Sequence, residues 1–138
     1  MSETTKLIFE KETFAINGAA MEVHSQLGCG FLESVYQEAI EYELRFRNIP
    51  FEAQPELSIS YKEQTLKHKF RPDLLVFGQV VVELKTLDRL GPNEDAQMLN
   101  YLKATGLPIG LLLNFGASRL QWRRLLRPHL VIPVVGQT

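Results

Sequence analysis

The chain has 138 residues, the length of one ordinary domain. Hydrophobic residues make up 45% of it and charged residues 22%, a composition that argues against intrinsic disorder, a collagen-like repeat and a coiled coil. The formal net charge is -1, so no strong overall field would draw the protein onto DNA or an anionic membrane. Any polyanion would have to be bound locally.

The cysteine content and the apolar runs predict a soluble, cytoplasmic protein. The single cysteine, Cys29, has no partner for an intramolecular disulfide, and residues 1–14 lack the apolar run of a signal peptide. No apolar stretch approaches the roughly 20 residues needed to cross a bilayer. Because no partner base is implied for Cys29, we expect a small buried residue there rather than a nucleophile.

Two helices are predicted at the beginning of the chain. The first should end near Gly28 and Gly30, because apolar residues precede them at alternating steps of four and three: Ile16, Ala20, Val23 and Leu27. The second should end before Ile49 and carries two apolar stripes, which predict that it is covered on two sides. One stripe consists of Val35, Ala39, Tyr42 and Phe46, and the other of Leu32, Tyr36, Ile40 and Leu44.

The periodicity then changes to that of strands. Glu56–Tyr61 alternates as a half-buried strand and is followed by polar turn residues. Leu66–Phe77 and Val80–Thr86 are predicted to form a hairpin around Gly78 and Gln79. The segment between the second and third helices should therefore hold three strands.

A third helix and two more strands follow. Asn93 is the expected N-cap of this helix, and Gly106 should end it. Ile109–Phe115 has the pattern of a buried strand and Leu120–Leu125 that of an exposed one. The predicted element order is ααβββαββ, an α/β fold of the mixed α+β type.

Charged residues occur in the predicted hairpin at positions where the surrounding pattern calls for apolar side chains. Because side chains alternate along a strand, Glu83 and Lys85 share one face while Leu84 takes the other. On the partner strand, Asp73 directly precedes an apolar run. One reading of Asp73, Glu83 and Lys85 is a functional site, and the other is a cross-strand salt-bridge cluster without chemistry.

The register of the hairpin decides whether Asp73 and Glu83 can meet. If they stand opposite each other on one face, the connection must hold an odd number of residues, most simply 77–79. Gly78 or Gln79 would then have a positive φ. A two-residue turn at Gly78 and Gln79 would instead place the two carboxylates on opposite faces.

Two facing carboxylates repel, and one would hold a proton in a partly buried site unless a cation lay between them. Asp and Glu oxygens with a strand carbonyl and water suit Mg²⁺ or Mn²⁺, whereas zinc would want His and Cys. The three histidines are scattered, at His24, His68 and His129. The sequence therefore favours a hard cation.

Two helices offer further polar side chains. Glu33 falls in the first turn of the second helix. It either adds a third acid to the site or only stabilises the N-terminus of the helix. On the third helix, Gln97 and Tyr101 are four residues apart and so share one face. Alone, this second pair is a weak signal.

Taken together, these positions resemble the PD-(D/E)xK nuclease superfamily, and more narrowly the small bacterial proteins named after their G-x-x-E-x-x-Y signature. The similar segment runs from about Met21 to Leu126 and includes the 30–36 segment, Asp73, the 83–85 segment, and Gln97 with Tyr101. The resemblance implies a restriction-endonuclease-like core, a central mixed sheet flanked by helices. It also implies one nuclease-like domain over residues 1–138, with a core at about 10–127.

The resemblance also implies roles for the site residues. Asp73, Glu83, the carbonyl of Leu84 and Glu33 would bind Mg²⁺, with Mn²⁺ as a substitute. Lys85 would orient and activate the attacking water. Substrate contacts would come from Gln97, Tyr101 and Tyr36. The implied activity is hydrolysis of phosphodiester bonds in DNA by a metal-activated water.

An alternative stays open: a catalytically silent module that keeps the nuclease fold to bind nucleic acid or a protein. An intact Lys85 favours the enzyme, because binding alone would not need it. Endonuclease or exonuclease action stays open, as does a homodimer or a larger DNA-processing partner. Basic residues could form a path for DNA or simply be solvated strand faces: Lys67, His68, Lys69, Arg71, Arg119, Arg123, Arg124 and Arg127.

Overall fold

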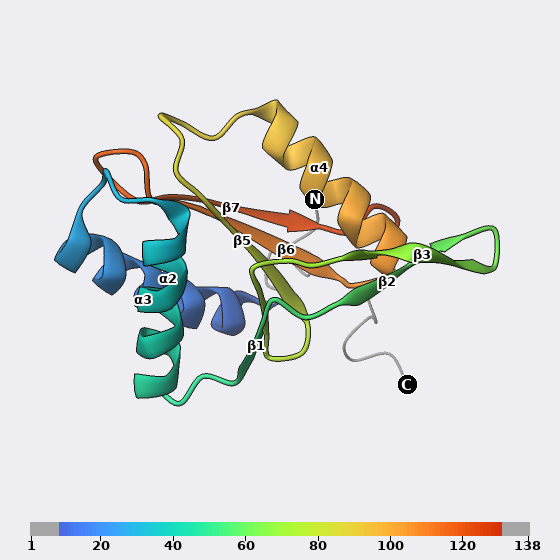
Figure 1. The fold of residues 1–138 in the computed structure, drawn as a ribbon, viewed down its shortest axis with the longest axis horizontal. Coiled ribbons are helices and arrows are strands. Elements are labelled where there is room, and N and C mark those ends of the chain that lie inside the picture. Colours follow the sequence, from blue (N-terminus) through green and yellow to red (C-terminus); the bar gives the residue numbers. More distant parts are fainter. Residues whose placement is uncertain (1–8, 131–138) are drawn as a thin grey trace, which may run out of the picture.

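A computed structural model describes residues 9–130 (Figure 1). Five strands form the main sheet, in the order β1-β4-β5-β6-β7, and β2 pairs with β3 in a separate two-stranded sheet. The helices are α2 (Glu10–Leu27), α3 (Glu33–Phe46) and α4 (Pro92–Thr105). The strands are β1 (Phe51–Ala53), β2 (Leu57–Tyr61), β3 (Gln64–Phe70), β4 (Leu74–Val76), β5 (Val80–Lys85), β6 (Ile109–Asn114) and β7 (Gln121–Leu126).

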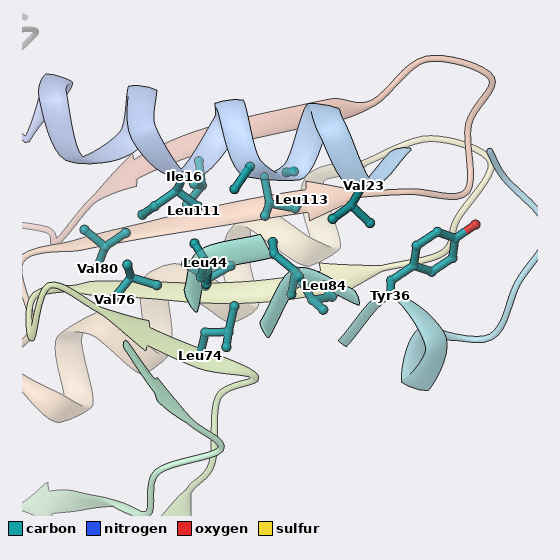
Figure 2. Packing of buried hydrophobic residues seen from close by; sticks show 14 of the residues in the cluster. Ile16, Val23, Tyr36, Leu44, Leu74, Val76, Val80, Leu84, Leu111 and Leu113 are labelled. Atoms are coloured by element: carbon teal, nitrogen blue, oxygen red, sulfur yellow. The ribbon is translucent and has the colours of Figure 1, made fainter. Parts of the chain in front are cut away.

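The main sheet is mixed and has a helical layer on each face. β5 pairs antiparallel with β4 and parallel with β6, and α4 makes the connection that a parallel pair requires. One face packs against α2 and α3 through residues such as Ile16, Leu44 and Leu111, which Figure 2 shows. The other face packs against α4 through Met98 and Leu102. The predicted α/β fold with a central mixed sheet is therefore confirmed.

The strand count between α3 and α4 differs from the prediction, because five strands replace the expected three. The single strand expected over Leu66–Phe77 is split into β3 and β4 by residues 71–73. Pro72 lies in this break, and proline cannot donate a backbone hydrogen bond to a ladder. The short strand β1, which was not predicted, pairs with β4 at the edge of the sheet.

The ends of α4 are determined by two different devices. The helix begins at Pro92 with Gly91 as its N-cap, so the expected cap at Asn93 is wrong. The side chain of Glu94 accepts a hydrogen bond of 2.7 Å from the Gly91 N–H, which satisfies a donor at the helix start. At the other end, Gly106 has a φ of 79° and stops the helix as predicted.

The helix α3 is covered on one side, not on two as predicted. Tyr36, Ile40 and Leu44 are fully buried against the sheet and α2, but the side chains of Tyr42 and Phe46 are 67% and 83% exposed. The reason is the layer arrangement, since Ala39 of the outer stripe is partly buried but within residues 9–130 no element covers Tyr42 and Phe46. Cys29 is likewise exposed rather than buried, because it lies in the loop between α2 and α3.

No helix among residues 9–130 has both the length and the apolar character that a bilayer-spanning helix needs.

Candidate active site

The hairpin that joins β4 and β5 has the register that a shared acidic site requires. Leu74 pairs with Val82 and Val76 pairs with Val80, so three residues, 77–79, form the connection. Extending this register by one residue places Asp73 opposite Glu83. Gly78 has a φ of 68°, as predicted, and Phe77 also has a positive φ, of 56°, which the sequence did not indicate. The parity argument is therefore confirmed.

Alternation along the strands places the acids and the lysine on the α4 side of the sheet. Leu75 and Val81 pack in the cluster with α4, whereas Leu74 and Leu84 pack in the cluster with α2 and α3. Glu83 and Lys85 flank Leu84 in the strand, so their side chains point away from α2 and α3 and toward the α4 side. Their strand lies in the middle of the sheet, which gives the charged side chains a rigid support.

Three hydrogen bonds, from different parts of the chain, hold Asp73. Its Oδ2 accepts a bond of 2.7 Å from the backbone N–H of Leu84 in β5. Its backbone carbonyl accepts bonds of 3.0 Å from the Gln37 side chain in α3 and from the backbone N–H of Gln54 after β1. The carboxylate of Asp73 therefore has a defined orientation beside Glu83.

The carbonyl of Leu84 lacks the backbone partner that a continuous ladder would provide. The same register places Leu84 opposite Pro72, and proline has no N–H to donate. The N–H of Leu84 bonds instead to the side chain of Asp73. Pro72 thus leaves a backbone oxygen without its usual donor next to the acids.

The carboxyl groups lie in one another's electrostatic fields. Burial raises the pKa of Glu83 from 4.5 to about 8, helped by the negative charge of Asp73 and by a hydrogen bond between the two carboxyl groups, and opposed by Lys85. Burial also raises the pKa of Glu33, again with the charge of Asp73 adding to the effect and Lys85 opposing it. Without a cation, the site therefore favours a retained proton.

The three acidic side chains line two separate hollows and do not converge on one point. Glu33 and Asp73 line a hollow of about 250 Å³ together with Gln37 and Leu84. Glu83 lines a second one, of about 360 Å³. Across residues 9–130, no group of three or more His, Cys, Asp or Glu side chains stands ready to hold a metal ion. The register places Asp73 opposite Glu83, but Glu33 lies on α3, so the expected convergence of three acids on one point is not found among residues 9–130.

The donor set nevertheless fits a hard divalent cation. Every candidate ligand is an oxygen, contributed by Asp73, Glu83, Glu33 and the Leu84 carbonyl, and no Cys or His lines either hollow. The pKa of Glu83 is raised first by burial and then by the charge of Asp73, and a bound cation would oppose both effects by favouring the ionised carboxylate. The residues present therefore match the chemistry of Mg²⁺ or Mn²⁺.

The polar pair on α4 lies in the same hollow as Glu83 and Lys85. The side chain of Gln97 accepts a hydrogen bond of 3.5 Å from the Lys85 ammonium group, which orients the lysine. The ring of Tyr101 stacks on Phe70, with the ring centres 3.8 Å apart. This stack ties α4 to the β2–β3 hairpin and holds the phenol at the edge of the hollow.

Tyr36, a predicted substrate contact, lies in the core and lines neither hollow. Its hydroxyl donates a hydrogen bond of 2.5 Å to the carbonyl of Gly28, and its ring stacks on Phe115 with the centres 4.7 Å apart. These contacts anchor the loop that leads into α3. Tyr36 thus helps to position Glu33 rather than to expose a group to a substrate.

Two polar residues near the acids were missed from the sequence. Gln37 lies four residues after Glu33 on α3, a spacing that could have revealed it. Asn114 is completely buried at the end of β6, where it pairs with Lys85. Its side chain bonds both the N–H and the carbonyl of Leu87, at 2.8 and 3.0 Å, and so holds the chain that leaves β5. A polar residue inside an apolar run was the available signal.

Comparisons with known structures agree with this fold. A structure described as the crystal structure of SSO0001 has a TM-score of 0.56 and 19% identity; the match covers 91% of this chain and 63% of that one. An alkaline exonuclease, LHK-Exo, from Laribacter hongkongensis has a TM-score of 0.51 and 14% identity, with 80% of this chain and 68% of that one covered. At these identities the two structures support the fold alone.

The remaining comparisons concern sequence. No curated protein matches the chain. The family model described as the PD-(D/E)XK nuclease superfamily matches residues 10–125, a range that contains all the acids, the lysine and the polar pair described above. The chain belongs to the PD-(D/E)XK nuclease superfamily.

Proposed function

We propose that this protein is a nuclease that hydrolyses phosphodiester bonds of DNA with the help of a divalent cation, Mg²⁺ or in its place Mn²⁺. The observation that carries the proposal is the pairing of Asp73 with Glu83 across β4 and β5, with Lys85 on the same face. Superfamily membership supports it. Gly30, Glu33 and Tyr36 support a narrower assignment to the G-x-x-E-x-x-Y proteins.

The ligands proposed for the cation are Asp73, Glu83, the Leu84 carbonyl and Glu33. A bound divalent cation polarises a phosphoryl oxygen and lowers the pKa of a coordinated water. The Asp73 carboxylate is held in place by the Leu84 N–H, so it can act as a fixed ligand at little cost in side-chain entropy. Glu83 must lose its proton before it can bind the cation.

Lys85 has the position of a group that orients the attacking water and stabilises the charge that grows on the phosphate. Its ammonium group lies in the hollow with Glu83, and Gln97 limits its motion. Gln97 and Tyr101 line the same hollow and are suited to contact the phosphate next to the scissile bond. We expect the product to carry a 5′-phosphate, as the superfamily resemblance implies.

Basic residues of the β2–β3 hairpin support a nucleic-acid substrate. Lys69 and Arg71 line the same hollow as Glu83 and Lys85, and Lys67 is exposed further along β3. Figure 1 shows the hairpin projecting beyond the main sheet beside α4. Because the net charge of the protein is -1, a phosphate backbone would have to bind to local basic residues such as these.

The test is a cleavage assay on linear, circular and single-stranded DNA with Mg²⁺, Mn²⁺ or EDTA. We expect cleavage with either metal and none with EDTA, and a rate at least about 100-fold lower in Lys85→Ala. Lys103→Ala, an exposed lysine at the far end of α4, is the matched control and should cleave normally. Cutting of circular DNA would identify an endonuclease.

Two results would overturn parts of this proposal. Cleavage at the normal rate by Lys85→Ala would remove the proposed role of the lysine. Calorimetric binding of Mn²⁺ that is unchanged in Asp73→Asn would remove the proposed metal site. DNA binding without cleavage in either metal would support the alternative, a catalytically silent binding module that retains the fold.

A further inference from the structure

The outer face of α3 carries an apolar stripe with the spacing of a coiled-coil seam. Its residues are separated by alternating steps of four and three, which is the heptad pattern: Val35, Ala39, Tyr42 and Phe46. Leu32, the N-cap residue of α3, precedes Val35 by three residues and extends this spacing. Leu32, Tyr42 and Phe46 are 77%, 67% and 83% exposed, and Val35 is 37% exposed. So large an uncovered stripe on a helix is typical of an interaction surface.

A groove lies beside this stripe. It has a volume of about 470 Å³ and is lined by Leu27, Ser34, Val35, Glu38, Ala39 and Tyr42. The smaller side chains of Ala39 and Val35 line it together with the exposed ring of Tyr42, and the exposed ring of Phe46 follows one turn later on α3. The surface therefore offers both projecting rings and a recess that can receive a ring, which a self-complementary interface requires.

The charges beside the stripe identify the occupant that fits. Glu38 and Arg45 are seven residues apart, so they occupy the same heptad position on the same flank of the stripe. In two antiparallel α3 helices related by a two-fold axis, this flank meets itself, and each Glu38 faces the Arg45 of the other copy. Both residues are exposed, and the Arg45 guanidinium, which pairs with Glu41, also lies over the Tyr42 ring, 5.8 Å from its centre, at the edge of the stripe.

The same register matches the apolar side chains by size. It sets Tyr42 of one copy against Ala39 of the other, and Phe46 against Val35, whose side chain lines the groove. Each contact thus joins a large residue to a smaller one, as interdigitating layers require. The charge pairs and the size pairs point to one arrangement, in which the partner is a second copy of this chain.

We propose that the protein forms a two-fold symmetric homodimer through antiparallel packing of α3 on α3. A 14-residue helix is about 21 Å long, so this contact is smaller than a standard interface and the dimer should dissociate in the micromolar range. Glu33, Gln37 and Asp73 line the neighbouring hollow and not this groove, so the proposed metal ligands lie outside the contact. The dimer does not depend on the proposed nuclease activity.

Sedimentation equilibrium across the micromolar range tests this dimer. We expect a concentration-dependent monomer–dimer equilibrium, and monomer alone for Tyr42→Glu. Phe14→Glu is the matched control, because Phe14 is 79% exposed on α2 and lies outside the stripe, so this variant should dimerise normally. A monomeric wild-type protein at all concentrations, or a Tyr42→Glu variant that dimerises normally, would overturn the proposal.

A charge exchange tests the antiparallel pairing. Glu38→Arg and Arg45→Glu should each raise the dimer Kd about tenfold or more, because each brings like charges together across the axis. Arg45→Glu also removes the ion pair with Glu41 within the helix, so the mixture of the two variants tests the register. An equimolar mixture of the two variants should form a heterodimer, since every intermolecular pair is then opposite in charge. Variants that fail to associate on mixing would overturn the antiparallel register.

Discussion

Replacement of Glu83 by glutamine should stabilise the metal-free protein at alkaline pH. Burial beside Asp73 raises the pKa of Glu83 from 4.5 to about 8, so the folded protein holds a proton that the unfolded chain has already lost in that range. Glutamine resembles the protonated acid in shape and can still donate a hydrogen bond to Asp73. The variant therefore keeps the favourable form of this side chain at every pH.

The sign and the size follow from the linkage between protonation and folding. Between pH 4.5 and about 8 the native state binds more protons than the unfolded state, so stability falls as the pH rises, by about 1.4 kcal/mol per pH unit. Below this window both states are protonated, and above it both are ionised. The wild-type protein should thus lose a few kcal/mol on going from about pH 5 to pH 9, a loss that the glutamine variant avoids.

Urea unfolding in EDTA, followed by circular dichroism, measures this difference. Glu52→Gln is the matched control, because Glu52 is an exposed carboxylate on β1, and it should follow the wild-type curve. Excess Mg²⁺ should raise the alkaline stability of the wild-type protein and leave that of Glu83→Gln little changed, since a cation binds the ionised carboxylate. Parallel stability curves for wild type and Glu83→Gln between about pH 5 and pH 9 would refute the reasoning.

Three further predictions concern the surroundings of the site. Asn114→Asp should cost about 2–4 kcal/mol in urea unfolding, because an oxygen would replace the amide donor that faces the Leu87 carbonyl; an unchanged midpoint would contradict this role. Gly116→Ala should cost about 1–3 kcal/mol in the same assay, since its Cβ would lie 2.5 Å from the backbone oxygen of Leu87, and normal stability would mean that this loop yields freely. The double variant of Lys67 and Lys69 to alanine should weaken DNA binding and reduce the slope of log K against log salt by about 2 with kcat unchanged, and an unchanged slope would exclude the hairpin from the DNA path.

The relation between Asp73 and Glu83 could be derived from the sequence because it is a matter of parity. Once β4 and β5 are joined by an odd number of residues, side chains that pair across the strands must share a face. The turn residue Gly78 made such a connection easy to recognise. The same local logic located the ends of α2 and α4 at Gly28 and Gly106, both with positive φ.

The division of the 66–77 segment could not be derived in the same way. Pro72 is a local sign that a strand can break there, but it does not show that the two halves belong to different sheets. Only the pairing of β1 with β4, and of β2 with β3, separates them. The two apolar stripes of α3 posed a similar problem, since a stripe shows that a face can be buried but not whether anything covers it.

By itself, the sequence determined the type of most helices and strands and the shared face of Glu83 and Lys85, because these follow from spacing along a single chain segment. Only the tertiary structure decided that Glu33 approaches Asp73 from another layer, that Tyr36 belongs to the core, and that burial raises the pKa of Glu83. Such properties depend on contacts between segments far apart in the chain, and the desolvation that produces them exists only once those segments have packed.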